Sequence, residues 1–117
     1  APTVSQLIVE GILEPKAFGQ MATYEAGLLC ARTEGVIAAP ETNHALACVV
    51  DEAKKAKEEG KEKVILFNWS GHGLIDLSAY DKYLSGQLTD YDFPAEDIEE
   101  AEKVLEQYPK PEIIKSF

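Results

Sequence analysis

The residues best suited to chemistry lie in one turn, Asn68-Trp69-Ser70-Gly71-His72-Gly73, directly after the apolar run Val64–Phe67. Small residues let backbone N–H groups approach a ligand, and a helix that follows such a turn favours polar or anionic groups. The Ser70 hydroxyl could attack a substrate only with a neighbouring base. The Gly-x-Ser-x-Gly motif of hydrolases is also missing, because Asn68 replaces its first glycine. We therefore favour a hydrogen bond from Ser70 to a ligand, with a bond inside the turn as an alternative of nearly equal weight.

His72 stands between two glycines, which predicts an accessible imidazole. Such an accessible imidazole is placed to face a ligand. A solvent-facing loop histidine is the commoner case when the residue is taken by itself.

Glu41, His44 and Cys48 share one face of a predicted helix. Glu-x-x-His forms half of some metal sites, but it normally occurs in pairs with further carboxylates. A zinc site that also recruits His72 is thus a minor alternative. We prefer Glu41 at a helix start facing a ligand pocket, with His44 packed behind it. Cys30 and Cys48 lie on apolar helix faces and are interpreted as reduced core thiols, with a disulfide between them as the open alternative.

Hydrophobic periodicity and stop signals define the elements that must position these residues. Gly11, Gly35, Gly60 and Gly86 are expected to end helices, and Ser78-Ala79-Tyr80-Asp81 resembles a capping box. A short buried strand or a connector is expected over 36–40, and a strand covered on both faces over 64–67. The predicted helices span residues 4–13 (closing at Gly11), 20–33, 42–59, 78–84 and 95–108, the last stopped by Pro109 and Pro111.

Strand–helix alternation predicts an α/β fold with helices packed on a short parallel sheet. Two or three strands are few for a free-standing parallel sheet, and the chain begins at Ala1 rather than Met. We therefore expect residues 1–117 to be a single-domain fragment of a longer protein.

Composition narrows the class of partner. The chain has 117 residues and a net charge of -10, which argues against nucleic acid and anionic membranes as partners. No apolar run reaches the roughly 20 residues of a membrane span, and no signal peptide is visible. A cytoplasmic protein is expected. Residues 87–117 carry nine acidic residues against three lysines. This composition predicts a solvated acidic helix and tail, and an interaction surface is the less favoured alternative.

Phosphate loops and activated lysines are both missing from the sequence. Neither a Walker loop nor Gly-x-Gly-x-x-Gly occurs. A Schiff-base lysine needs a partly desolvated pocket. Every lysine here lies in charged or polar surroundings or, like Lys16, in a connector.

Two blocks resemble a known family. Glu34-Gly35-Val36-Ile37-Ala38-Ala39-Pro40-Glu41-Thr42-Asn43-His44-Ala45 is followed some twenty residues later by Val64-Ile65-Leu66-Phe67-Asn68-Trp69-Ser70-Gly71-His72-Gly73. Together they resemble the C-terminal portion of a tryptophan synthase β chain, more closely the second, tryptophan-synthase-like branch. The likeness extends over nearly the whole chain.

This resemblance implies a fold-type II pyridoxal-phosphate enzyme, a cytoplasmic homodimer that condenses L-serine with indole to give L-tryptophan. It places Ser70 at the pyridine nitrogen of the cofactor and Glu41 beside the ring. Gly71 and Gly73 would let backbone pack close to the cofactor, with His72 between them in the same binding turn. A hydroxyl does not force the pyridine nitrogen to be protonated, which suits β-elimination. Residues 1–86 would form the cofactor-facing α/β part, and 87–117 the acidic helix and tail.

The resemblance also predicts what this chain lacks. The Schiff-base lysine, the phosphate cup and the catalytic carboxylate belong upstream, so the isolated chain is expected to be inactive, with no catalytic residue and no covalently bound cofactor. The first branch usually has Arg at the position of His72, which puts partnership with an α subunit in doubt. The alternative is a non-catalytic α/β module that binds a phosphate-bearing ligand through the Ser70–Gly73 turn.

Overall fold

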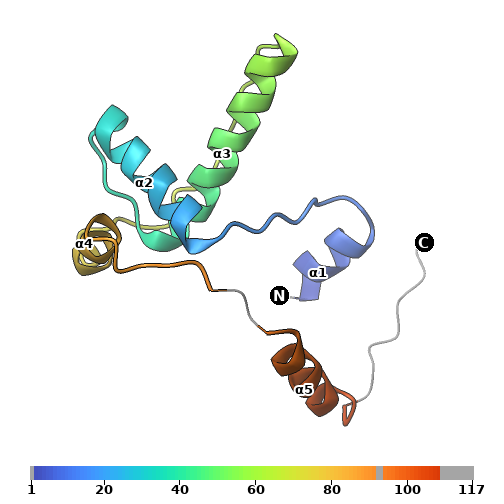
Figure 1. The fold of residues 1–117 in the computed structure, drawn as a ribbon. Helices are drawn as coiled ribbons and strands as arrows, with labels where there is room; N and C mark the ends of the chain where they lie inside the picture. The colour runs from blue at the N-terminus through green and yellow to red at the C-terminus, as the bar shows by residue number, and fades with distance from the viewer. Residues whose placement is uncertain (1, 92–93, 109–117) are drawn as a thin grey trace.

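The computed structural model describes residues 2–91 and 94–108. Within them the chain forms α1 (Pro2–Val9), α2 (Gln20–Glu34), α3 (Pro40–Glu59), α4 (Leu77–Leu84) and α5 (Ala95–Leu105). Helix α2 packs along α3 and contacts α4, whereas α1 and α5 contact no other helix in the described ranges. Figure 1 shows α2, α3 and α4 gathered together, with α1 and α5 lying apart at the two ends. The three central helices thus carry the core.

Small residues bring α2 and α3 close together. A Cβ at Gly27 would lie 2.6 Å from Cγ of Asn43, so only glycine allows this approach. Asn43 itself is fully buried. The core cluster beside this contact is made of alanines and one leucine. Its buried members are Ala26, Ala38, Leu46 and Ala47.

The predicted helix stops at Gly35 and Gly60 are confirmed. Both glycines adopt left-handed backbone, with φ of 72° and 64°, and their N–H groups donate to carbonyls of the preceding turn. Helix α3 begins at Pro40 rather than at residue 42, because the fixed φ of proline suits the first helical position. Gly11 likewise has a φ of 72°, although α1 already ends at Val9.

The predicted capping box at Ser78 is wrong. Helix α4 begins at Leu77, and no side chain caps it. The N–H of Asp76 donates to the carbonyl of Gly73, and the carbonyl of Asp76 accepts the first helical N–H groups. A backbone turn therefore starts the helix, which puts Ser78 in its first turn. Helix α5 ends at Leu105, three residues before the prediction, and Pro109 and Pro111 lie outside the described residues.

The predicted strands are not formed as a sheet within residues 2–91 and 94–108. Residues 36–39 form a connector with one antiparallel bridge, Ala38 to His72, and Pro40 is already the first residue of α3. Residues 64–67 have no strand partner, and the expectation that they are buried on both faces is wrong for this chain. Val64 is 101% exposed and Leu66 95%, since no neighbouring element covers them. The parallel sheet therefore stays a prediction.

Both cysteines are unpaired and half-buried, as the sequence predicted. Burial raises the pKa of the Cys30 thiol, and the charge of Glu34 adds to the effect. Among the described helices, none combines the length and apolar character that crossing a membrane requires.

Candidate functional site

The two blocks that carry the resemblance meet in space. Residues 37–43 comprise the end of the connector before α3 and the first turn of that helix. They lie against residues 70–73 of the turn, and we call this pair of segments the junction. The Gly73 N–H donates to the carbonyl of Ile37 at 2.9 Å. The Ala39 N–H donates to the carbonyl of Gly71 at 3.0 Å. These two bonds flank the Ala38–His72 bridge and fix the turn against the start of the helix.

The side chain of Thr42 ties the two segments together. Thr42 is 1% exposed and lies in the first turn of α3. Its Oγ1 lies 2.9 Å from Oγ of Ser70 and accepts the Gly71 N–H at 3.2 Å. It also lies 3.3 Å from the Gly71 carbonyl oxygen. The Ser70 hydroxyl is therefore held by a side chain from the other segment of the junction.

A buried polar pair supports the junction from behind. The Tyr80 hydroxyl donates to the carbonyl of Ala38 at 2.6 Å, and Nδ2 of Asn43 donates to that hydroxyl at 2.9 Å. Burial raises the pKa of Tyr80, although the hydrogen bond from Asn43 acts in the opposite direction. Tyr24 packs edge-on against the Tyr80 ring, with 5.1 Å between centroids. Helices α2, α3 and α4 thus converge on the Ala38 carbonyl.

The turn glycines have separate packing roles. A Cβ at Gly73 would collide with the carbonyl oxygen of Ala38 and lie 2.9 Å from Cγ2 of Ile37. A Cβ at Gly71 would lie 3.3 Å from Cβ of Ala39, which is tight but less severe. Gly73 is buried, so its lack of a side chain serves the contact between the segments of the junction.

Three predicted site residues lie on the surface of this junction. Ser70, His72 and Glu41 are all exposed. Glu41, in the first turn of α3, lines a pocket of about 280 Å³ that does not include Ser70. His44 is also exposed and lines this pocket, so the expectation that it packs behind Glu41 is wrong. The pocket is completed by Gln20, Thr23, Tyr24 and Pro40.

The orientation of His72 is set by its own turn. Its Nδ1 accepts the Leu74 N–H at 3.3 Å. In the neutral imidazole the proton then resides on Nε2, which leaves a donor available to the surroundings. The zinc alternative gains no geometric support, because no three His, Cys, Asp or Glu side chains gather within the described part of the chain.

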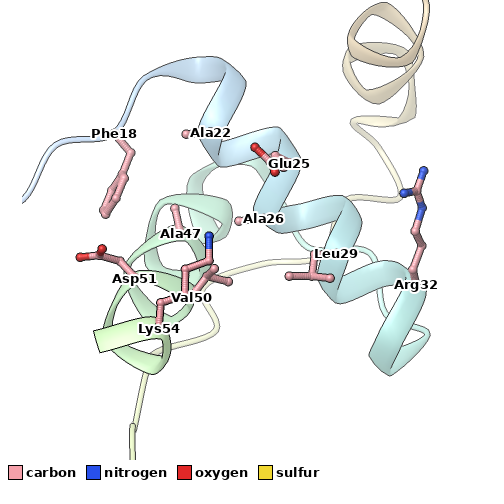
Figure 2. Close-up of a pocket in the computed structure, with 10 residues that line it drawn as sticks. All are labelled: Phe18, Ala22, Glu25, Ala26, Leu29, Arg32, Ala47, Val50, Asp51 and Lys54. Carbon is pink, nitrogen blue, oxygen red and sulfur yellow. The ribbon is translucent and has the colours of Figure 1, made fainter. Parts of the chain in front are cut away.

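A second pocket lies in the groove between α2 and α3, away from the junction. Figure 2 shows Phe18 at one end and side chains of both helices around it. Its volume is about 380 Å³, and it shares no residue with the Ser70–Gly73 turn. The lining combines apolar side chains with four charged ones, Glu25, Arg32, Asp51 and Lys54.

Sequence reasoning missed three residues that hold the junction together: Thr42, Asn43 and Tyr80. For Thr42 and Asn43 a signal was present, since they are polar side chains in the first turn of a helix whose apolar stripe continues at Leu46. Polar groups at buried positions need partners, which points to a second segment packed there. Their partners lie 28 to 42 residues away in the sequence, beyond any local pattern.

The comparisons with known proteins identify relatives along most of the chain, although no family model matches it. The tryptophan synthase beta chain of Thermococcus gammatolerans is 56% identical over 98 residues, which is 81% of this chain and 22% of that protein. Tryptophan synthase beta chain 2 of Aquifex aeolicus is 56% identical, covering 77% of this chain and 21% of the relative. That of Methanosarcina mazei is 51% identical, covering 75% and 20%. The chain spans about a fifth of the length of these relatives.

Proposed function

We propose, because the homologues of this chain are tryptophan synthase β chains, that it forms the cofactor-ring side of the active site in such an enzyme. The structural observation that carries the proposal is the junction. Two blocks separated by some twenty residues meet and present the Ser70 hydroxyl at the surface. A site assembled in this way would be completed by other parts of a longer enzyme.

Ser70 is proposed to donate a hydrogen bond to the pyridine nitrogen of pyridoxal phosphate. When bound, that cofactor supplies the electron sink for replacement at the β carbon of an amino acid. The residues present fit this group, since Ser70 is an exposed, neutral hydroxyl held by Thr42. A neutral donor leaves the pyridine nitrogen unprotonated, whereas a carboxylate would favour its protonated form.

Glu41, His72 and the turn glycines are proposed to surround the same ring. Glu41 is exposed at the start of α3, beside a pocket. His72 leaves its Nε2 available for a ligand, since Nδ1 accepts from Leu74. Gly71 and Gly73 keep the backbone of the turn free of side chains, so that it can lie close to a flat ligand.

The extended segment 64–67 is proposed to join a parallel sheet supplied by the rest of that enzyme. Val64 and Leu66 are fully exposed here, which fits a strand whose neighbours lie elsewhere. The covalent anchor of the cofactor would also come from elsewhere. Lys16 is a poor nucleophile, because hydrogen bonding to Glu52 raises its pKa and keeps it protonated.

The whole enzyme is proposed to make L-tryptophan from L-serine and indole as a cytoplasmic homodimer. We propose residues 1–86 as its cofactor-facing part here and 87–117 as an acidic helix and tail. Helix α5 is amphipathic and has acidic residues in its first turn, which suits the helix dipole.

The experiment is a chimaera. The matching segment of the Thermococcus gammatolerans β chain is replaced by this chain, and tryptophan formation from L-serine and indole is measured. We expect an active chimaera whose kcat/KM falls about tenfold or more in Ser70→Ala, since one hydrogen bond to a bound group is lost. Ser78→Ala, at an exposed serine of α4, is the matched control and should leave the rate unchanged.

Two results would count against this function. One is a folded chimaera that forms no tryptophan. The other is a tight, stoichiometric complex of inorganic phosphate with the isolated chain, lost on Ser70→Ala, which would favour the phosphate-binding module.

A further inference from the structure

Thr42 uses its side chain in an unusual way for a helical threonine. In helices such hydroxyls commonly bond back to the carbonyl one turn earlier or point to solvent. The hydroxyl of Thr42 is buried and is shared between Ser70 and Gly71, which lie 28 and 29 residues further along the chain. One of its contacts is Ser70, the residue proposed to donate a hydrogen bond to the pyridine nitrogen.

The hydrogens of this group can be assigned by counting. A threonine hydroxyl has one proton and two acceptor sites. One acceptor site takes the Gly71 N–H at 3.2 Å. The single proton then points either to Oγ of Ser70 at 2.9 Å or to the Gly71 carbonyl at 3.3 Å. That carbonyl already accepts the Ala39 N–H at 3.0 Å, so the shorter contact with Ser70 is the better use of the proton.

We propose that Thr42 is a positioning residue, which donates its hydroxyl proton to Ser70 and so leaves the Ser70 proton directed out of the chain toward a ligand. The proposal rests on the function above, in which that ligand is the pyridine nitrogen. A hydroxyl that accepts a hydrogen bond becomes a stronger donor and a weaker acceptor. Thr42 therefore determines that the Ser70 hydroxyl acts as a donor toward the ligand, in addition to holding its position.

The opposite orientation would give opposite chemistry. If Ser70 donated to Thr42, only its lone pairs would face the ligand, and these favour a protonated pyridine nitrogen. Removing the Thr42 hydroxyl frees Ser70 to adopt either orientation. The pKa of the pyridine nitrogen should therefore rise when Thr42 loses its hydroxyl, an effect that a purely structural role does not produce.

The test uses the chimaera loaded with pyridoxal phosphate labelled with ¹⁵N in the ring, and follows the ring-nitrogen shift against pH. Thr42→Val keeps the shape without the hydroxyl, and Thr42→Ser restores the hydroxyl. In Thr42→Val the pH of protonation should rise by about one unit, and cofactor affinity should fall about tenfold. Thr42→Ser should titrate like the parent, with affinity within about twofold of it.

Amide hydrogen exchange of the isolated chain supplies the control for folding. In Thr42→Val the Gly71 amide should exchange faster, because its acceptor is gone, while the Ala39 and Gly73 amides keep theirs. Unchanged Ala39 and Gly73 amides show that the junction is intact. With the junction intact, an unchanged ring titration in Thr42→Val overturns the inference.

A chimaera that binds no cofactor with Thr42 in place overturns the proposed function instead. The isolated chain then decides the local claim. A Gly71 amide that exchanges equally fast in the parent and in Thr42→Val would overturn the bond network from which the inference is built.

Discussion

The junction and the extended segment 61–68, which leads into the turn of the junction, differ sharply. They differ in how many of their side chains find partners within this chain. At the junction the polar groups are paired within the chain: Asn43 and Thr42 are buried and bonded. Along the extended segment Val64 and Leu66 are almost completely exposed. The first region is complete on its own, whereas the second has apolar side chains with nothing to cover them.

The contrast separates two kinds of sequence information. Residues of the junction are matched to one another, so their contacts form within the described chain. In the apolar run 64–67, Phe67 packs against the core of this chain, whereas Val64 and Leu66 are left exposed. That exposed face is matched to something else, because burial of such side chains needs neighbours on both faces. The junction can therefore form within this chain, although the neighbouring run 64–67 lacks the strands that would cover it.

The largest expected difference is between two leucines. Leu46→Ala should lower the free energy of unfolding by about 3 kcal/mol, since Leu46 is 5% exposed in the core. Leu66→Ala, at 95% exposure, should change it by less than about 0.5 kcal/mol. Urea denaturation of the isolated chain measures both. Equal losses would show that the extended segment is buried in solution and would break the comparison.

Gly73→Ala should be the next most damaging change. The new methyl group meets the Ala38 carbonyl, which is backbone and cannot rotate away. We expect a loss of about 2 kcal/mol in the free energy of unfolding, as for an overpacked core. Gly71→Ala is the control, because its Cβ meets only Ala39 Cβ at 3.3 Å and should cost much less. A reversed order would mean that the segments are packed differently.

Tyr80→Phe tests the polar support of the junction. It removes the donor to the buried Ala38 carbonyl and should cost about 1.5 kcal/mol of unfolding free energy. Tyr83→Phe keeps the ring stacked on Tyr24 and is the matched control, expected within about 0.5 kcal/mol of the parent. If both variants denature at the same urea concentration as the parent, the Tyr80 bond contributes nothing.

The smallest expected effect is a pH dependence from two carboxyls near the middle of α3, Asp51 and Glu52. A hydrogen bond from Lys55 lowers the pKa of Asp51, and one from Lys16 lowers that of Glu52. Carboxyls with lowered pKa stabilise the fold above their unfolded values, and this contribution is lost as the pH falls below the ordinary pKa values of 3.8 for Asp51 and 4.5 for Glu52. The stability should therefore fall slightly in acid, and less so in Lys16→Met.

This acid effect has a clear control. The pairs are solvent-exposed, so high salt should remove most of the difference between the parent and Lys16→Met. A difference that persists unchanged in about 1 M salt would point to another titrating group.

The sequence predicted helices well where the signals are local. The stripe over Leu46 and Val50 together with Gly60 places α3 and its end, and Gly35 places the end of α2. The start of α4 was misplaced, because a backbone turn at Asp76 outweighs the capping preference of Ser78. Periodicity alone could not establish the sheet, because a strand needs partner strands that no local pattern specifies.

The sequence identified only some of the residues of the candidate site. Ser70, Glu41 and His72 stand out by residue type and motif, and the structure places them around one junction or its rim. Thr42 and Tyr80 gain their roles only from long-range contacts, so their residue types alone do not reveal them. Two-segment sites are partly hidden from sequence reasoning for this reason.

The most direct test of the account is the protonation of the ring nitrogen in the chimaera when Ser70 becomes a carboxylate. With ¹⁵N-labelled pyridoxal phosphate bound, Ser70→Asp should raise the pKa of that nitrogen by roughly 1–3 units, because a nearby negative charge stabilises the protonated form. Ser78→Asp, which adds the same charge on α4, should leave it unchanged. Identical titrations in the two variants would contradict the claim that position 70 faces the cofactor.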